Sequence, residues 1–395
     1  MICRAILPVA ALLAVTLAAA AEETTPATTN PVHAAASYIM KACTKSGQFR
    51  YRINTDPTVR VTPKYNMLRH AGTIYALASY DERYPSPAGL ATLTRAVDFM
   101  QRYAIGGVGS QTNMLAVWSR PHISGSDDPL QAKLGGAGLG LVALLSARRA
   151  GVPHIEITTL RKLARFILFM QDEDGRLVAK YVPSQGGRCD NWVSLYYPGE
   201  AALGLVMLYE IEPNPEWLDG ATQALTYLAR SREGEKELPA DHWALLATHR
   251  LLQLTRSYER SREDPLLRRH ANRLCDSILA GRISGTRYTG FTGDGRICPT
   301  ATRMEGLIAA LPLLSDPRLK ARALHAVTKG AVFLRHTQLK TEPWEGAWTR
   351  AATKLPADYP NLPDSFNRRA TEIRIDYVQH ALSALLMYEA LVTGN

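Results

Sequence analysis

The sequence predicts an all-α protein, an (α/α)6 toroid in which six outer helices surround six inner helices. Two observations predict it. Almost every periodic segment has the 3.6-residue spacing of a helix, and helices with one charged face alternate along the chain with helices that are apolar nearly all round. A helix that is apolar on every side is one that other helices surround. The alternation therefore indicates an inner ring within an outer ring, and an open solenoid of helical hairpins is the alternative that the sequence leaves open.

The predicted outer helices share an apolar stripe and a charged face, and they span Val32–Ser46, Pro87–Tyr103, Ile155–Gln171, Pro215–Ser231, Asp264–Ala280 and Pro317–Leu339. The predicted inner helices are rich in small and apolar residues, and they span Lys64–Ser79, Pro129–Ala147, Tyr196–Glu210, Ala240–Ser257, Pro299–Leu314 and Glu372–Val392. Glycine destabilises a helix by about 1 kcal/mol relative to alanine. We therefore expect close approach of neighbouring backbones at the inner-helix glycines, which are Gly135, Gly136, Gly138 and Gly140. In a closed ring, the first and last hairpins must also meet.

The first residues are predicted to be a targeting segment. Met1–Ala21 carries one charge near its start, followed by an apolar run and a stretch of alanines, which is the layout of a secretory signal peptide. The run is too short and too rich in alanine for a membrane anchor. Residues 22–31 are predicted to be a flexible leader, and 32–395 a single domain. We therefore expect an exported protein, periplasmic or extracellular, with no membrane span.

The composition excludes several classes of protein. The 395 residues are 46% hydrophobic, which is typical of a globular chain rather than a disordered one. The net charge of +10 is spread along the sequence, which favours solubility or an anionic ligand over nucleic-acid binding. No zinc-binding helix motif, phosphate loop or Cys-x-x-Cys motif is present, so no metal and no cofactor are predicted.

Four cysteines follow the predicted signal peptide, and four cysteines allow three pairings. Cys43 and Cys275 fall on outer helices of the first and fifth hairpins, which the sixth separates in a closed ring. Their Cα atoms should then lie beyond the limit of about 7 Å for a disulfide. Any native disulfide is therefore predicted to join Cys189 and Cys298.

Loop length predicts which end of the ring is functional. Five of the six connections from an outer to an inner helix are much longer than a helix connection needs. These long loops span Gly47–Pro63, Ala104–Asp128, Asp172–Leu195, Gly281–Cys298 and Lys340–Thr371, and Glu233–Pro239 is the short one. Long loops gathered at one end of a scaffold usually form a site. All six inner helices begin at that end, and their N-terminal N–H groups favour negative charge.

Aromatic residues gather at the same end. Five of the six tryptophans lie in the long loops or at the start of an inner helix, and they are Trp118, Trp192, Trp243, Trp344 and Trp348. An aromatic-rich cleft is suited to stacking on sugar rings, and we expect Trp192 and Trp243 to stack in this way. The alternative for each tryptophan is that it packs a loop onto the ring.

Carboxylates near the inner-helix starts are the candidate catalytic residues. Ionisable groups on buried apolar helices are costly unless they are paired or functional. Cleavage of a glycosidic bond needs one carboxylic acid to protonate the leaving oxygen and a second carboxylate to activate water or attack the sugar. Asp241 and Glu200 are predicted to do this, with Asp190 as a third candidate. The alternatives are a helix cap for Asp241, a helix-dipole role for Glu200 and a turn for Asp190.

Other side chains near the inner-helix starts are predicted to hold the substrate, and they are Tyr65, Asn66, Arg69, His70, Lys133, Trp192, Tyr197, His242, Trp243, Arg303, Glu305, Arg374 and Asp376. The cations among them, together with the basic net charge, favour an acidic sugar. Two alternatives stay open: Glu305 and Asp376 could pair with arginines on their own helices, and His70 could be a buried histidine with satisfied hydrogen bonds.

The paired helices, signal peptide, loop tryptophans and inner-helix carboxylates together resemble the six-hairpin glycosidase superfamily over about Val32–Val392. The resemblance is architectural and rests on no family motif, so it carries over no catalytic position. It implies a toroid that acts on glycans.

Hydrolysis of a poly- or oligosaccharide is the predicted function. The first alternative is a polysaccharide lyase or uronate C5-epimerase. In it, Asn66 and Arg69 would neutralise a carboxylate, His70 would abstract the C5 proton, and Tyr197 would donate one. The second alternative is a glycan-binding or assembly protein without catalysis. The sugar, its linkage and the oligomeric state are left open.

Overall fold

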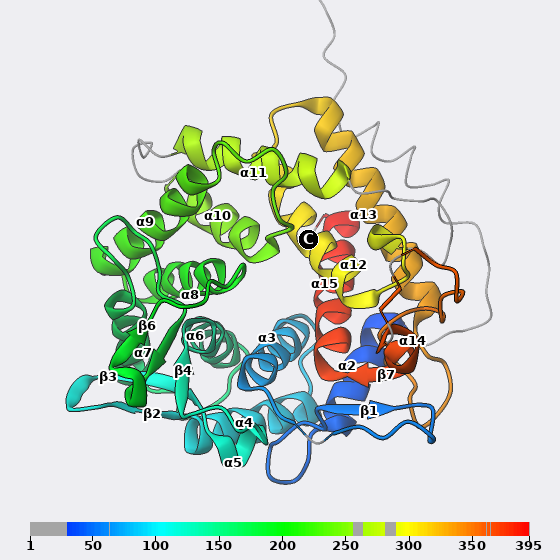
Figure 1. Ribbon diagram of the computed structural model, residues 1–395, viewed down its shortest axis with the longest axis horizontal. Helices are drawn as coiled ribbons and strands as arrows, with labels where there is room; N and C mark the ends of the chain where they lie inside the picture. Colours follow the sequence, from blue (N-terminus) through cyan, green and yellow to red (C-terminus); the bar gives the residue numbers. More distant parts are fainter. Residues whose placement is uncertain are drawn as a thin grey trace, which may run out of the picture.

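The computed structural model describes residues 30–62, 64–255, 264–280, 290–360, 362–363 and 365–394. The predicted signal peptide and most of the predicted leader lie outside these residues. Figure 1 shows a ring of helices viewed down the shortest axis of the molecule. No helix among the described residues is long and apolar enough to cross a membrane.

The outer helices are α2 (Pro31–Ala42), α4 (Pro87–Tyr103), α7 (Ile157–Phe169), α9 (Pro215–Ser231), α11 (Asp264–Ala280) and α13 (Pro317–Thr337). The inner helices are α3 (Met67–Arg83), α6 (Leu134–Arg149), α8 (Tyr197–Ile211), α10 (His242–Thr255), α12 (Ile297–Ala310) and α15 (Ile375–Thr393). The bounds of α4, α9 and α11 agree with the sequence prediction. The first outer helix begins one residue before Val32 because the Asn30 side chain accepts a hydrogen bond of 2.8 Å from the Val32 N–H and caps it.

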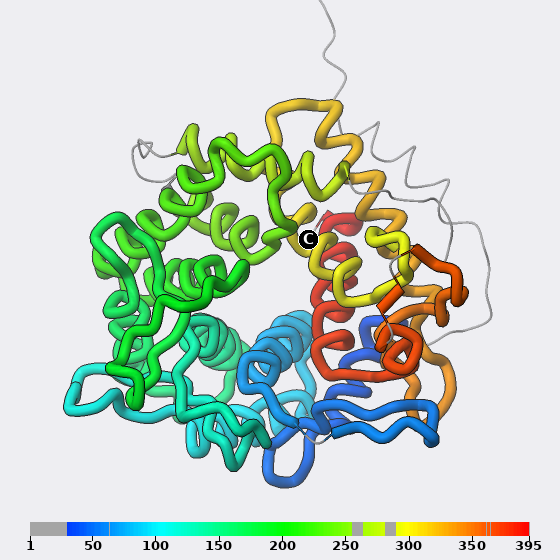
Figure 2. The backbone as a smooth tube through the Cα atoms, viewed as in Figure 1, coloured from blue at the N-terminus to red at the C-terminus, as the bar shows by residue number. Residues whose placement is uncertain are grey.

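The ring is closed. Each inner helix packs against the next along the chain, and the last, α15, packs against both α3 and α2. In Figures 1 and 2 the red C-terminal helix accordingly lies beside the blue N-terminal hairpin. This arrangement confirms the (α/α)6 toroid and is incompatible with an open solenoid, whose first and last repeats stay apart.

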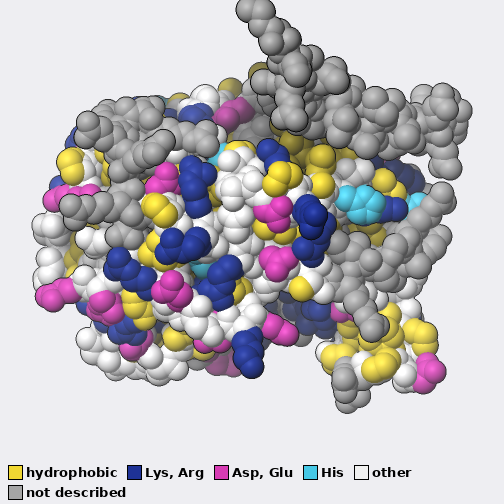
Figure 3. Space-filling model, turned by 90° about the horizontal axis from the view of Figure 1, so that it is seen from above, with side chains coloured by type: hydrophobic (Ala, Val, Ile, Leu, Met, Phe, Trp, Pro, Cys, Tyr) yellow, Lys and Arg dark blue, Asp and Glu magenta, His cyan; other side chains and the backbone are white. Residues whose placement is uncertain are grey.

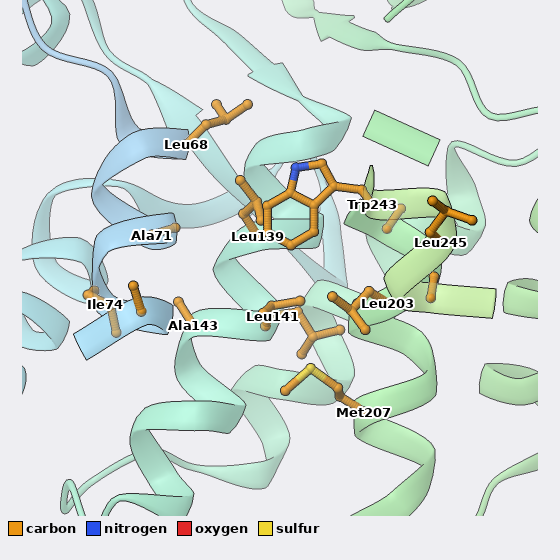
Figure 4. Packing of buried hydrophobic residues seen from close by; sticks show 14 of the residues in the cluster. Leu68, Ala71, Ile74, Leu139, Leu141, Ala143, Leu203, Met207, Trp243 and Leu245 are labelled. Carbon is orange, nitrogen blue, oxygen red and sulfur yellow. The ribbon is translucent and has the colours of Figure 1, made fainter. Parts of the chain in front are cut away.

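Glycine allows the inner helices to approach closely. A Cβ atom at Gly138 would lie only 2.6 Å from the backbone nitrogen of Ala201 on α8, so the two helices could not hold this distance with a larger residue. Figure 4 shows apolar side chains of α3, α6, α8 and α10 meeting in the middle of the ring, with the Trp243 indole directed toward Leu139.

Short strands in the long loops are the part of the fold that the sequence analysis missed. The second and third long loops form a five-stranded antiparallel sheet of β2 (Ile105–Val108), β3 (Gln111–Ser119), β4 (Gln131–Lys133), β5 (Lys180–Val182) and β6 (Gly187–Cys189). The first and last long loops meet where β1 (Arg52–Asn54) pairs with β7 (Glu372–Arg374). The strands β4 and β7 end at the residue before α6 and α15, so the predicted starts of these helices at Pro129 and Glu372 were wrong.

The remaining short elements are two helices, α5 (Pro121–Ser124) and α14 (Ser365–Ala370), and three 3-10 turns, η1 (Pro183–Gln185), η2 (Gly290–Thr292) and η3 (Leu311–Leu313). The surface face in Figure 3 carries Lys and Arg side chains interspersed with Asp and Glu rather than gathered in one basic patch. This distribution agrees with the charge pattern of the sequence.

Candidate functional site

A cleft of about 500 Å³ opens at the end of the ring where the inner helices begin, and every inner helix contributes to its walls. Ten of the predicted site residues line it: Asn66, Arg69, Trp192, Tyr197, Glu200, His242, Trp243, Arg303, Arg374 and Asp376. Six do not line it: Tyr65, His70, Lys133, Asp190, Asp241 and Glu305. The cleft therefore lies at the end of the ring that loop length and tryptophan content predicted. Of the three carboxylates predicted to be catalytic, Glu200 lines it, whereas Asp241 and Asp190 do not.

Asp241 does not face the cleft. Its side chain is fully buried, Oδ2 accepts a hydrogen bond of 2.9 Å from Arg232, and Oδ1 accepts one of 3.1 Å from the Ala244 N–H. Burial raises the pKa of Asp241, and the Arg232 charge acts against this rise. The geometry is that of a helix cap with an ion pair, which is the alternative that the sequence left open for this residue.

Asp190 and Lys133 also lie away from the cleft. Asp190 is exposed after β6 and forms an ion pair of 2.5 Å with Arg176. Lys133 ends β4, where it pairs in register with Lys180, and it is half-buried before α6. Lys133 thus belongs to the loop sheet, and Asp190 directly follows its last strand.

His70 and Tyr65 form a buried hydrogen-bond network behind α3. The His70 Nε2–H donates to the Ala96 carbonyl at 2.9 Å, and Nδ1 accepts from the Tyr65 hydroxyl at 2.7 Å. The same hydroxyl accepts from the Phe49 N–H at 3.0 Å. Burial lowers the pKa of His70 to about 4. The expectation that His70 abstracts a substrate proton was therefore wrong, because both ring nitrogens are occupied and the residue does not line the cleft.

Glu200 is one of two buried carboxyl groups that line the described part of the cleft. It lies in the first turn of α8, and its Oε2 has no hydrogen-bond partner among the described residues. Burial, with a smaller contribution from Asp241, raises the pKa of Glu200 well above its usual value, and the Arg69 charge opposes the rise. The raised pKa favours the protonated form of this group, which can donate a proton or a hydrogen bond. Gly135 on α6 makes room for it, because a Cβ atom there would overlap Glu200 Oε2 and the Tyr197 ring.

Asp376 has the opposite environment. Arg374 donates to its two oxygens at 2.5 and 2.8 Å, and Arg69 on α3 donates to it at 2.9 Å. Burial alone would raise the pKa of Asp376, but the two guanidinium groups outweigh it and lower the pKa to about 2. Asp376 is therefore an ionised carboxylate held between α3 and α15. The ion pair with Arg374 is the alternative that the sequence left open for Asp376.

Two histidines approach one buried glutamate at the cleft. The Nδ1–H of His380 on α15 donates to Glu305 Oε2 on α12 at 2.9 Å. His242 Nε2 on α10 lies 3.9 Å from the same oxygen. Neither ring nitrogen of His242 has a hydrogen-bond partner among the described residues, and burial lowers its pKa well below the usual value. His242 is therefore a neutral imidazole.

The donor atoms of His242, Glu305 and His380 lie within 4.8 Å of one another, so within the described part of the chain this is the group that could share a divalent metal ion. Glu305 does not pair with Arg303 on its own helix, because its carboxylate is directed to the histidines.

The tryptophans divide into two groups. Trp192 is 43% exposed at the edge of the cleft, with its ring 5.4 Å from that of Tyr197, and Trp243 is buried in the cleft floor. Trp118 and Trp348 are buried and donate to backbone carbonyls at 3.2 and 2.8 Å. Trp344 packs against the core. These last three hold loops onto the ring, which is the alternative considered for them.

Sequence reasoning missed several residues of the cleft, including Tyr196, Cys298, Thr302, Gln379 and His380. A signal for His380 was present, since it follows Asp376 by four residues and so shares its helix face. The pair predicted for any native disulfide, Cys189 and Cys298, is not joined in the structure. Cys189 and Cys298 are free thiols, because Cys189 lies in β6 against Gln185 whereas Cys298 lines the cleft. Cys43 and Cys275 are also unpaired.

No family model and no curated protein matches this sequence. Solved structures share its fold over nearly the whole chain. A D-mannose isomerase is 14% identical with a TM-score of 0.61, and the match covers 94% of this chain and 100% of that one. The cellobiose 2-epimerase from Bacillus thermoamylovorans B4167 is 11% identical with a TM-score of 0.63, over 88% and 95% of the two chains.

The GH76A alpha-1,6-mannanase from Salegentibacter sp. HEL1_6 is 13% identical with a TM-score of 0.59, over 92% of this chain and 98% of that one. A variant of that mannanase with asparagine at two consecutive aspartates is described as inactive. These proteins are (α/α)6 toroids of the six-hairpin glycosidase-like superfamily, and the likeness confirms the resemblance at the level of the fold.

Proposed function

We propose that this protein is a carbohydrate-active enzyme that moves a proton between positions of a sugar, as a sugar isomerase or epimerase does. One observation carries the proposal: His242 and His380 line the cleft from two inner helices, and a single buried carboxylate, Glu305, lies beside both. A histidine oriented by a carboxylate is a general base, because the carboxylate fixes the tautomer and stabilises the imidazolium that forms.

The reaction follows from this placement. In the open-chain form of an aldose, the carbon next to the carbonyl group carries a weakly acidic proton. His380 takes this proton on Nε2, and the C–H electron pair forms the double bond of an enediolate. Return of the proton to the former carbonyl carbon, with transfer of the proton of the adjacent hydroxyl group to the former carbonyl oxygen, gives the ketose. Return of a proton to the opposite face of the carbon that lost it re-forms the original carbonyl group and gives the epimer. Atoms and electrons balance without an oxidant.

Other cleft residues have supporting roles in this proposal. Glu200, whose raised pKa favours its protonated form, donates a hydrogen bond to the oxygen on which negative charge develops. Trp243 lies under the cleft as an apolar floor, and Trp192 offers an aromatic face at its edge. The D-mannose isomerase and the cellobiose 2-epimerase with the same fold support this reaction class.

Hydrolysis of a glycosidic bond, the function predicted from the sequence, is the second candidate. It is favoured by the opposite pKa shifts of Glu200 and Asp376, which suit a general acid and a carboxylate base. We rank it second because two arginines occupy the Asp376 oxygens. The single pair of consecutive aspartates in this sequence, Asp127 and Asp128, is exposed and does not line the cleft.

Incubation in D₂O separates the two candidates. Purified protein is incubated with D-mannose, cellobiose and α-1,6-mannotriose, and the sugars are examined by NMR and mass spectrometry. A proton-transfer enzyme produces an isomer or epimer carrying deuterium at carbon, whereas a hydrolase produces shorter sugars without carbon-bound deuterium. His380→Gln should abolish the exchange, and His325→Gln on the exposed face of α13 is the matched control. Glycan binding without either product would favour the non-catalytic alternative.

We also propose that the protein acts outside the cytoplasm, because the first residues have the layout of a secretory signal peptide. N-terminal sequencing of the protein recovered from its native cells tests this, and an intact Met1 would contradict it.

A further inference from the structure

We infer that the sugar bound in this cleft carries a carboxylate group and that Arg303 binds it. The inference rests on the proposed function in one respect, that the cleft is a sugar site, and it adds the substrate class. The sequence suggested an acidic sugar, and the inference specifies which residue of the cleft wall binds its acidic group.

Among the described residues that line the cleft, Arg303 is the cation without an ion pair. It lies on α12 and lines the cleft, its Nη1 is buried without a hydrogen-bond partner, and no ion pair to another described residue satisfies it. Asp294, an acidic group that acts on it electrostatically, is already bound to Arg296 at 2.7 Å. Glu305, two residues further along α12, is directed to His380. Arg303 as a whole is half-buried, but its buried Nη1 has lost its water without gaining a partner, which is costly, and an anionic ligand removes that cost.

The other two arginines of the cleft differ from Arg303. Arg69 and Arg374 share Asp376, which is ionised between them. The described lining of the cleft holds three arginines, and the carboxylate that forms ion pairs with two of them is Asp376. Arg303 is therefore the arginine of the described cleft lining that has no carboxylate at short range, whereas Arg69 and Arg374 share one.

A carboxylate fits this position better than a phosphate ester. A carboxylate carries one charge and two oxygens, which one guanidinium group can bind in a bidentate manner. A phosphate monoester carries a charge of about −1.5 to −2 at pH 7, which a single arginine leaves partly unbalanced. The ligand class is thus a sugar acid, with its carboxylate at Arg303 and its ring toward the two histidines.

Titration calorimetry tests this with D-glucuronate, D-galacturonate, D-glucose and glucose 6-phosphate as ligands. The wild type should bind at least one uronate about 10- to 100-fold more tightly than glucose, which corresponds to one charge-assisted hydrogen-bonded pair. Arg303→Gln should remove this preference, and Arg303→Lys should keep part of it. Arg322→Gln is the matched control, because Arg322 lies on α13 and pairs with Asp276 on α11, away from the cleft.

Two results would overturn the inference: equal affinity of the wild type for glucose and both uronates, or an unchanged uronate preference in Arg303→Gln. Tighter binding of glucose 6-phosphate than of either uronate would assign Arg303 to a phosphate and overturn the carboxylate assignment. If Arg303→Gln fails to fold by circular dichroism, the salt dependence of uronate binding to the wild type decides, since a charge pair must weaken with ionic strength. Binding is measured without turnover, so these results stand whether or not deuterium exchange is found.

Discussion

His380 on the last inner helix is joined to Glu305 on the fifth by a hydrogen bond of 2.9 Å between Nδ1 and Oε2. This bond leaves His380 Nε2 as the nitrogen that accepts a proton. It also directs Glu305 away from Arg303, although the two residues are only two positions apart on α12. One helix thus provides both the group that orients the base and the unpaired cation that we assign to the substrate.

Glu305 is therefore expected to act through His380. Glu305→Gln keeps the size of the side chain but removes the negative charge that stabilises the imidazolium, so turnover should fall by about 10²-fold or more, with a smaller change in KM. Deuterium exchange under single-turnover conditions measures the effect. Glu173→Gln, in an exposed turn, is the control. A loss of exchange that is accompanied by a large drop in the thermal unfolding temperature would instead indicate a purely structural role.

Glu200→Gln should lower turnover and should also change how stability depends on pH, and the two effects are measured independently. If Glu200 donates a proton or a charge-assisted hydrogen bond, turnover should fall by about 10²–10⁴-fold with the fold intact. Its buried carboxyl has a raised pKa, so the unfolded chain releases this proton from about pH 4.5 upward while the folded chain keeps it. The wild type should lose stability relative to the variant as pH rises from 4.5 toward the higher pKa of the folded state.

Urea unfolding of both proteins at pH 5 and pH 8 measures this difference. The free energy of unfolding of Glu200→Gln relative to the wild type should be higher at pH 8 than at pH 5. A constant difference would mean that Glu200 ionises normally in the folded protein.

Much of the fold could be predicted because the signal is local. The bounds of α4 and α9 were predicted to the residue, since both begin with proline after a capping residue, Ser86 or Asn214. The strands could not be predicted in this way. β4 and β7 have three residues each, and they exist because loops far apart in sequence pair with them. The pairing of β7 with β1 also requires the ring to close, because β1 lies in the first long loop and β7 at the end of the last.

The site could be predicted by its position and less well by its residues. Asp241 and Glu200 give the same sequence signal, a carboxylate at the start of an inner helix. Only the packing decides that Asp241 meets Arg232 at the end of α9 while Glu200 meets the cleft. In the same way, Asp376 binds Arg69, a residue 307 positions earlier in the chain.

Asp376→Asn should destabilise the ring where α15 meets α3. The substitution leaves Arg69 and Arg374 without their shared carboxylate, and breaking a buried pair from one side costs about 3 kcal/mol. Because the pKa of Asp376 is lowered to about 2, its contribution in the wild type is complete above pH 3.8 and is lost as pH falls toward 2. Chemical unfolding at pH 7 measures the cost. Asp219→Asn, on the exposed face of α9, is the control and should cost less than about 0.5 kcal/mol.

His70 should make the wild type sensitive to mild acid. Its pKa is about 4 in the folded chain against 6.5 in the unfolded chain, so the unfolded state binds the proton first and stability falls as pH drops from 6.5 to 4. The loss assigned to this group is about 3 kcal/mol. His70→Gln should be less stable than the wild type at pH 7.5 because it breaks the network with Tyr65 and Ala96. The difference between the two proteins should narrow at pH 4.5, and parallel pH curves would contradict this account.

Gly135→Ala tests the placement of Glu200 without changing any ionisable group. Alanine favours a helix over glycine by about 1 kcal/mol, so the substitution would be stabilising if the position were open. Here the added Cβ overlaps Glu200 Oε2 and the Tyr197 ring, so Glu200 must leave its position in the cleft. We expect turnover to fall toward that of Glu200→Gln while the protein stays folded. Gly136→Ala on the same helix is the control, because its Cβ would come no closer than 3.3 Å to a neighbour. Full activity in Gly135→Ala would exclude Glu200 from the reaction.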